Sequence, residues 1–285
     1  MAKGLKSHVR LHMLFLDNNK ITEKGAEYLS ECLKNKQDLR VLNIDNNQIG
    51  ARGAELVAEQ LKNNFGLSKL YCDQNDIGPH GAIALAQSME MMDSLKKICL
   101  ENNNIQDAGA VQLAKSLEEN DTLLSLYLED NGIGRDGAVA LGQMLCNKFK
   151  LSKLYISNNP IGDDGFHSIA VGLTDIETLR NLKIADTNIT HTSIPHLAKC
   201  LANKRFMTQL VLDNNKIGVQ GAQMLADGIR DNETMTDLRI ANCQIGEDGA
   251  IAIASVLSNK KNLLVLDVTS NKIMVNGCIH ICKAI

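Results

Sequence analysis

A fixed period of 28 residues constrains the fold of this chain more than any other feature. Leu or Met opens each of ten units, with no insertion or deletion, at positions 11, 39, 67, 95, 123, 151, 179, 207, 235 and 263. Position 4 of each unit is Leu or Ile, position 6 is apolar and position 11 is Ile. Such a period predicts a solenoid of stacked repeats. Residues 1–285 are therefore expected to form one domain, in which residues 1–10 end a preceding repeat.

The two halves of each unit have different periodicities. Apolar residues at positions 4 and 6 alternate with residues that point the other way, which predicts a short strand with one buried face. In the second half, small residues at positions 16 and 20 and large ones at 19 and 23 share one face of a helix. Position 15 is Gly in nine of ten units, with Ser193 as the exception, so the helix can start close to the strand layer.

Stacking these units produces a curved array, because a helix needs about 10 Å of lateral space and a paired strand about 4.8 Å. We predict an α/β horseshoe with a parallel β-sheet on its concave face and α-helices on its convex face. Position 9 is Asn in eight of ten units, and its amide can satisfy the backbone where each strand ends. Stacked Asn side chains should form a buried polar row, and the exceptions, Thr187 and Cys243, should keep part of that bonding.

The pattern LxxLxLxxNxI, followed by N-x-I-G-x-x-G-A-x-x-L, resembles the leucine-rich repeat family over essentially the whole chain. Its uniform 28-residue unit is similar to the ribonuclease-inhibitor-like subclass. That subclass includes NOD-like receptor sensor regions, Ran GTPase-activating proteins and ribonuclease inhibitors, and the uniform length resembles the NOD-like type most. The resemblance implies the fold and not an activity, because the family shares an architecture alone. We expect a protein-binding module without enzymatic activity or cofactor.

Composition argues against several classes of protein. The formal charge of −3 and the absence of long like-charged runs disfavour a nucleic-acid partner or a polybasic membrane anchor. No segment approaches the roughly 18 apolar residues of a membrane span, and the N-terminus lacks a signal-peptide stretch. The eight cysteines are scattered without the spacing of a disulfide framework. We therefore expect reduced thiols, no metal and a cytoplasmic location.

Three of the four tyrosines, Tyr71, Tyr127 and Tyr155, occupy position 5 of their units. Positions 3, 5, 7 and 8 should face the concave space, so these rings form one row of roughly 14 Å. Aromatic residues on a rigid surface are typical of binding hot spots. The other predicted partner-binding residues are Lys69, Lys97 and Lys153 at position 3, Asp73, Glu101 and Glu129 at position 7, and Lys183 and Arg239 at position 5. The alternatives are strand propensity for Tyr and solvation for the charges.

Two segments resemble sites of chemistry. Residues 132–137, GIGRDG, match the dinucleotide pattern G-x-G-x-x-G, but Gly134 and Gly137 are the repeat's own glycines and a solenoid sheet lacks the required crevice. Residues 278–282, CIHIC, place two Cys on one helical face, as a metal pair would. Cys278 and Cys282 nevertheless occupy small-residue positions, so we predict that both are core residues.

Cys99 falls at position 5, in the row expected to be exposed between Tyr71 and Tyr127. No His lies on positions 3, 5, 7 or 8, so a thiol there would lack a neighbouring base. We expect an accessible thiol without a catalytic role. Unit 7 departs from the pattern with Thr190, Ser193 and Pro195, which reflects either drift in one repeat or a local irregularity that shapes a binding surface.

These observations predict a recognition module that binds a partner protein on the concave surface of units 3 to 6. It would be the sensor or autoinhibitory region of a NOD-like intracellular receptor. The alternatives are a bacterial effector that binds a host protein, a Ran-GAP-like GTPase regulator acting through Arg52 and Arg135, and a structural scaffold or engineered array. Both ends of the chain fall in the last turn of a unit's helix and lack a polar cap. We therefore expect a slice of a longer protein, or ends covered by a partner or self-contact.

Overall fold

Each 28-residue unit folds into one short strand followed by one helix. The computed structural model describes residues 8, 10–90 and 92–285. The strands are β1 (Met13–Phe15), β2 (Val41–Asn43), β3 (Lys69–Tyr71), β4 (Lys97–Cys99), β5 (Ser125–Tyr127), β6 (Lys153–Tyr155), β7 (Asn181–Lys183), β8 (Gln209–Val211), β9 (Asp237–Arg239) and β10 (Val265–Asp267). The helices are α2 (Glu23–Leu33), α3 (Gly50–Leu61), α4 (Gly78–Met89), α5 (Gln106–Ser116), α6 (Arg135–Leu145), α7 (Gly162–Leu173), α8 (Ile194–Ala202), α9 (Gly218–Ile229), α10 (Gly246–Leu257) and α11 (Met274–Ala284).

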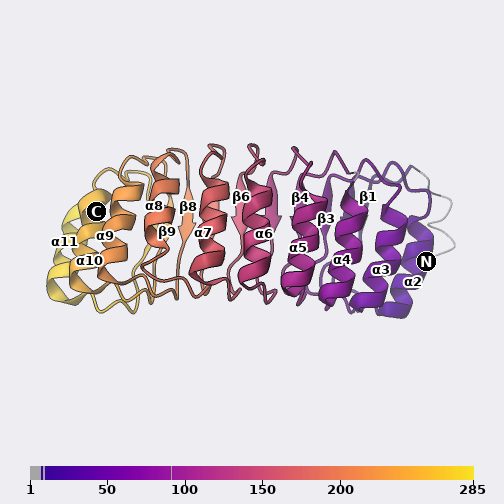
Figure 1. The fold of residues 1–285 in the computed structure, drawn as a ribbon, viewed down its shortest axis with the longest axis horizontal. Helices are drawn as coiled ribbons and strands as arrows, with labels where there is room; N and C mark the ends of the chain where they lie inside the picture. The colour runs from indigo at the N-terminus through magenta and orange to yellow at the C-terminus, as the bar shows by residue number, and fades with distance from the viewer. Residues whose placement is uncertain (1–7, 9, 91) are drawn as a thin grey trace.

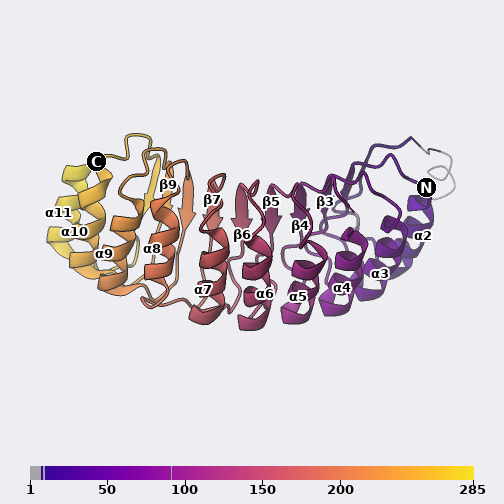
Figure 2. The ribbon, with the colours of Figure 1, turned by 45° about the horizontal axis from the view of Figure 1, so that its top comes forward.

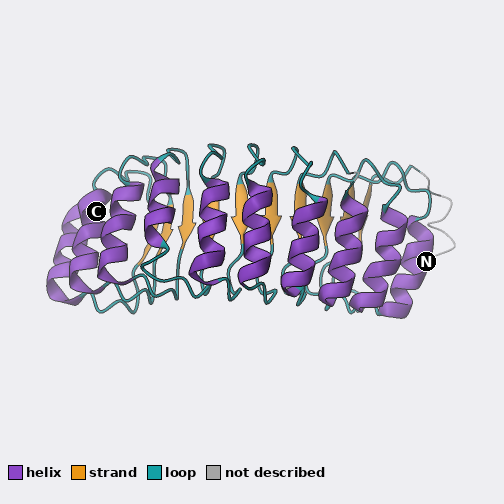
Figure 3. Ribbon diagram, in the orientation of Figure 1, coloured by secondary structure: helices purple, strands orange, loops and turns teal. Residues whose placement is uncertain are grey.

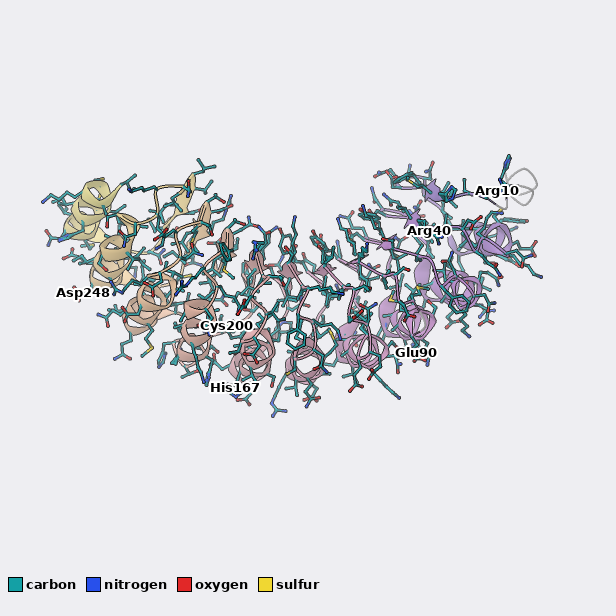
Figure 4. The ribbon with its side chains drawn as sticks, turned by 90° about the horizontal axis from the view of Figure 1, so that it is seen from above. Arg10, Arg40, Glu90, His167, Cys200 and Asp248 are labelled. Atoms are coloured by element: carbon teal, nitrogen blue, oxygen red, sulfur yellow. The ribbon has the colours of Figure 1, made fainter. Side chains whose placement is uncertain are left out.

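The strands form one parallel sheet in chain order, from β1 to β10. Neighbouring strands pair residues 28 positions apart, as Leu126 with Leu154 and Leu154 with Leu182. The helices form a second layer over one face of this sheet, and the two termini lie at opposite ends of the array (Figures 1 and 3). Figures 2 and 4 show the array bending, with the helices on the outer side. The predicted α/β solenoid, with a concave sheet and convex helices, is confirmed.

The core lies between the two layers. Strand residues at positions 4 and 6, such as Leu126 and Leu128, are buried against helix residues such as Ala138 and Leu141. The prediction for Cys278 and Cys282 is wrong, because both side chains are exposed. They project from α11, which is the outermost helix of the described chain, so no further helix covers them. None of the described helices combines the length and apolar character needed to cross a bilayer.

Seven of the eight Asn side chains at position 9 form the predicted buried row, and Asn19 in the first unit is exposed. Asn131 donates from Nδ2 to the carbonyl oxygens of Leu100 (2.8 Å), Leu128 (3.0 Å) and Glu129 (3.0 Å). Its Oδ1 accepts the backbone N–H of Asn103, at 3.0 Å. Each amide therefore joins its own strand end to the loop of the preceding unit, where it supplies an otherwise missing partner.

The two substitutions in this row keep part of the bonding, as predicted. The Thr187 hydroxyl donates to the carbonyl oxygen of Ile184, at 2.8 Å. The Cys243 thiol lies 3.3 Å from the carbonyl oxygens of Leu212 and Ala241. Neither side chain provides the amide oxygen that accepts backbone N–H groups of the preceding unit.

Three buried lysines join consecutive units in the loops that lead from a helix to the next strand. The Nζ atoms of Lys148, Lys204 and Lys260 donate to the carbonyl oxygens of Glu118 (2.7 Å), Thr174 (2.6 Å) and Arg230 (2.9 Å). These carbonyls lie at the C-terminal ends of helices in the preceding units, where a positive charge is favourable. Burial lowers the pKa of each lysine. The sequence analysis missed this role, since lysine is almost never fully buried unless paired.

Candidate functional site

Tyr71 on β3, Tyr127 on β5 and Tyr155 on β6 stand half-buried on the concave face. Tyr127 and Tyr155 pair in register, and their ring centroids are 4.7 Å apart at an interplanar angle of 81°. This edge-to-face arrangement is favourable for two aromatic rings. Because Tyr127 and Tyr155 lie on neighbouring strands, the spacing of the strands holds these two rings against each other.

Two lysines join the tyrosines into one continuous surface. Lys97 on β4 lies between the neighbouring rings, with Nζ 4.6 Å from the Tyr71 centroid and 4.7 Å from that of Tyr127. Lys183 on β7 places Nζ 4.1 Å from the Tyr155 centroid. All three distances are within the range of cation–π attraction. We name Tyr71, Lys97, Tyr127, Tyr155 and Lys183 together the aromatic–lysine stripe.

Cys99 lies beneath this stripe, and the prediction that it is accessible is wrong. Its side chain is 4% exposed. The thiol stands in register between the larger side chains of Tyr71 and Tyr127, with Lys97 over both rings. Burial raises its pKa above the ordinary range, with a smaller contribution from the charge of Asp73. A protonated, buried thiol is unreactive.

A polar network continues from the stripe toward the C-terminal units. The Tyr155 hydroxyl donates to Gln209 Oε1 (3.2 Å), and Gln209 Nε2 donates to Asp237 Oδ2 (3.0 Å). Arg239 Nε in turn donates to Asp237 Oδ1 (3.0 Å). The structure thereby links Arg239 to the tyrosines. Sequence reasoning missed Gln209 and Asp237, although both occupy position 3, the position used for the lysine row.

The acidic row at position 7 has a structural role in addition to its charge. Asp45 Oδ1 accepts the backbone N–H of Asp73 (2.7 Å), and Asp73 Oδ1 accepts that of Glu101 (2.6 Å). These bonds tie the strand ends of consecutive units together, so Asp73 has less freedom to bind a partner than the sequence suggested. Glu101 and Glu129, also half-buried, make no such backbone bond in the described structure.

Burial and crowding change the ionisation of this row. Burial, together with the charge of Asp45, raises the pKa of Asp73 to about 7. Burial and the charges of Asp73 and Glu129 raise the pKa of Glu101 to about 7. Among the described residues, no ion pair compensates Asp73, Glu101 or Glu129. A positive group placed beside this row would favour the ionised forms.

The remaining predicted residues stand apart from the stripe. Lys69 is exposed on β3 and Lys153 is half-buried on β6. Within the described part of the chain, neither lysine makes a cation–π contact with a tyrosine. The structure thus unites Lys97 and Lys183 with the aromatic rings, while Lys69 and Lys153 border the same surface.

In the loop of residues 132–137, backbone N–H groups that a phosphate would need are already hydrogen-bonded to a carboxylate. Asp107 Oδ1 accepts the backbone N–H groups of Gly134 (2.7 Å) and Gly137 (2.9 Å). A carboxylate at this place would also repel phosphate. This arrangement supports the interpretation of these glycines as part of the repeat.

The irregular unit 7 uses the same device with different groups. Asp163 accepts the backbone N–H of Thr190 (2.8 Å), its hydroxyl (2.8 Å) and the hydroxyl of Ser193. Asp163 and Asp107 occupy the same position of their units. The polar substitutions in unit 7 therefore bind the preceding helix start, on the side away from the concave stripe.

Comparisons with known proteins agree with this architecture. A family model described as "Leucine Rich repeat" matches residues 35–58, 119–142, 147–170, 203–226 and 231–254. The fold is similar to the crystal structure of an internalin, InlF, from Listeria monocytogenes strain 4b F2365. That likeness has a TM-score of 0.51 and 18% sequence identity, and it covers 99% of this chain and 87% of the internalin chain. No curated protein matches the sequence.

Proposed function

We propose that this leucine-rich repeat solenoid is a protein-recognition module that binds a partner protein on its concave face, with the aromatic–lysine stripe at the centre of the interface. The observation that carries the proposal is the continuity of the stripe across β3 to β7. Tyr and cationic side chains held by their neighbours lose little conformational entropy on binding. Tyrosines in such partly desolvated positions are typical binding hot spots.

The chemistry on the two sides of the stripe suggests how a partner would be oriented. Glu101 and Glu129 lie on the side of position 7, and their crowded carboxylates favour a basic group of the partner. Lys69 and Lys153 lie on the side of position 3, where an acidic group would be favoured. Opposite rows of charge fix orientation and register more than they add affinity. Arg239 would extend the same surface into unit 9.

The uniform 28-residue unit supports the ribonuclease-inhibitor-like, NOD-like type, and hence a sensor or autoinhibitory region. A bacterial effector that binds a host protein is the alternative. The structure joins none of the described cysteines in a disulfide, and five of the eight are buried, which suits a reducing compartment such as the cytoplasm. A GTPase-activating role has less support, because Arg52 pairs with Glu55 (2.8 Å) and Arg135 pairs with Asp164 (3.2 Å). We assign no catalytic residue.

The test removes the three rings of the stripe and, separately, three rings elsewhere. One variant carries Tyr71→Ala, Tyr127→Ala and Tyr155→Ala. The matched variant carries alanine in place of Phe65, Phe149 and Phe206, which are 55%, 60% and 58% exposed on loops that lead from helix to strand. Partners captured by the unaltered chain are identified by mass spectrometry, and their affinities for each variant are then measured by titration.

Each tyrosine that acts as a hot spot should contribute roughly 2 kcal/mol or more to binding. The tyrosine variant should therefore lose the partner, while the phenylalanine variant retains it. Thermal melts must show that both variants remain folded. The opposite result, with binding lost only in the phenylalanine variant, would move the interface to the loops and refute the concave site.

A further inference from the structure

Two histidines meet on the convex side of the molecule, far from the aromatic–lysine stripe. His167 on α7 and His196 on α8 have ring centroids 4.1 Å apart at an interplanar angle of 70°. Both side chains are exposed. Figure 4 shows His167 on the outer helix layer, pointing away from the sheet. The two rings therefore bridge neighbouring units at the solvent surface.

The helices that carry these histidines are held apart by their buried residues. At their contact, position 16 of α7 is Phe166 where most units have Ala, and position 15 of the next unit is Ser193 where the other units have Gly; both side chains are buried. Among the described helices, α7 and α8 pack more loosely than any other neighbouring pair. The imidazole rings span this contact at its outer surface, where both are open to solvent.

The imidazole nitrogens are available to a ligand. No hydrogen bond to His167 or His196 is present among the described residues. The two carboxylates in the first turn of α7 are engaged elsewhere, Asp163 with Ser193 and Asp164 with Arg135.

We propose that His167 and His196 form a two-ligand site for a divalent cation of the late first transition row, such as Zn²⁺, Ni²⁺ or Cu²⁺. Imidazole nitrogen suits these cations, whereas Mg²⁺ and Ca²⁺ take oxygen ligands. No group of three or more potential ligands gathers in the part of the chain that the structure describes, so water completes the coordination. Lys199, one turn beyond His196, weakens the site by charge repulsion. A bound cation would clip α7 to α8.

The test is calorimetric titration of ZnCl₂ into tag-free protein that carries Cys278→Ser and Cys282→Ser, which removes two exposed thiols. Thermal unfolding is followed with and without ZnCl₂. We expect saturable binding and a higher unfolding temperature. Either His167→Gln or His196→Gln should weaken binding about a hundredfold or more, because the second ligand then loses its high effective concentration. His80→Gln alters an exposed histidine on α4 and should leave binding unchanged.

Two further measurements test the effect of the neighbouring charge and the selectivity for the metal. Lys199→Gln should tighten binding of Zn²⁺, because it removes a like charge without touching a ligand. MgCl₂ should neither bind nor raise the unfolding temperature. Undetectable Zn²⁺ binding, or equal binding by the unaltered site and by His196→Gln, would overturn the proposal.

Discussion

Two neighbouring helix–helix contacts, which we call seams, are built from the same repeat positions but differ in packing. They are the contact between α6 and α7 and the contact between α7 and α8. Between α6 and α7, Gly142 and Gly172 bring the two backbones together, and a Cβ added to Gly172 would overlap the carbonyl oxygen of Gly142. Between α7 and α8, Phe166 replaces the usual alanine and Ser193 the usual glycine, and these two helices pack more loosely. One or two side chains per unit therefore set the spacing of the convex layer.

The concave side of the same two seams shows no corresponding difference. Tyr127 pairs with Tyr155 across the first seam, and Tyr155 pairs with Lys183 across the second, in the same parallel register. The strand ladder fixes strand spacing through backbone hydrogen bonds, which do not depend on side-chain size. The helices have no such ladder between them, so their separation follows the volume of the residues at the contact.

Phe166→Ala should have the largest effect on stability among the substitutions that test the difference between the two seams. The ring fills the space between α7 and α8, so its removal leaves a cavity and should lower the free energy of unfolding by about 3–5 kcal/mol. Urea denaturation measures this loss. Phe149→Ala, on an exposed ring, should change stability by less than about 0.5 kcal/mol. A loss below about 1 kcal/mol for Phe166→Ala would mean that the ring fills little of the space between α7 and α8, and that Phe166 does not set their spacing.

Gly172→Ala should disturb the tight seam by an intermediate amount. The added methyl group meets the rigid backbone of Gly142, and relieving such overpacking costs about 1–3 kcal/mol. Gly66→Ala is the matched control, because its Cβ would meet the flexible guanidinium of Arg40, which can turn away. Equal stabilities of the two variants in urea would show that α6 and α7 separate without cost.

Asp163→Ala should weaken the loose seam and change its pH dependence. The substitution leaves the Thr190 and Ser193 donors without their acceptor, at a cost of about 1–2 kcal/mol at pH 7. Partial burial opposes ionisation of Asp163, but hydrogen bonds from Ser193 and Thr190 outweigh it and hold the pKa below its ordinary value of 3.8.

Because the folded pKa is the lower one, this stabilisation is present above pH about 4 and is lost as the pH falls through the folded pKa. The difference between Asp163→Ala and the unaltered chain should therefore shrink between pH 7 and pH 3. Asp136→Ala, at an exposed site, should show little effect at either pH. A difference that stays constant with pH would contradict the assigned role of the carboxylate.

Thr187→Asn should give the smallest effect, a gain of about 1 kcal/mol. It restores the amide that other units place under the preceding loop; Asn159, for example, accepts the N–H of Ile133 at 3.0 Å. Cys243→Asn makes the same repair at a regularly packed seam. A smaller gain for Thr187→Asn than for Cys243→Asn in urea denaturation would show that the loose seam limits the polar row as well as the helices.

Much of the fold could be predicted from the sequence, because the strict period lets a pattern seen in one unit be checked in the others. The strand, the Asn row and the order of the layers follow from residues such as Leu126 and Asn131, whose environment repeats in each unit. Cys99 was misplaced because burial at position 5 depends on the size of the neighbours. Cys99 is small and stands between two tyrosines, so it is covered.

The same reasoning explains what was missed at the candidate site. The contacts of Lys97 and Lys183 with aromatic rings depend on side-chain rotamers, which a repeat pattern does not specify. The buried Lys148 was missed because lysine is predicted at the surface from composition, whereas its partner carbonyl exists only after two units stack. His167 and His196 lie 29 residues apart, so a search at the repeat spacing of 28 does not pair them.

The Asn row has a direction, and this direction matters when the molecule is pulled from its ends. Six of the eight amide oxygens accept N–H groups of the unit before them, as Asn131 does for Asn103, whereas Asn75 Oδ1 has no partner among the described residues. Removing the C-terminal unit of any stack therefore strands buried backbone donors in its neighbour, whereas removing the N-terminal unit leaves the next unit's own loop bonds intact. Under mechanical load the two ends of this solenoid are therefore not equivalent. Detaching a unit from the C-terminal end leaves unpaired N–H groups, and detaching one from the N-terminal end does not.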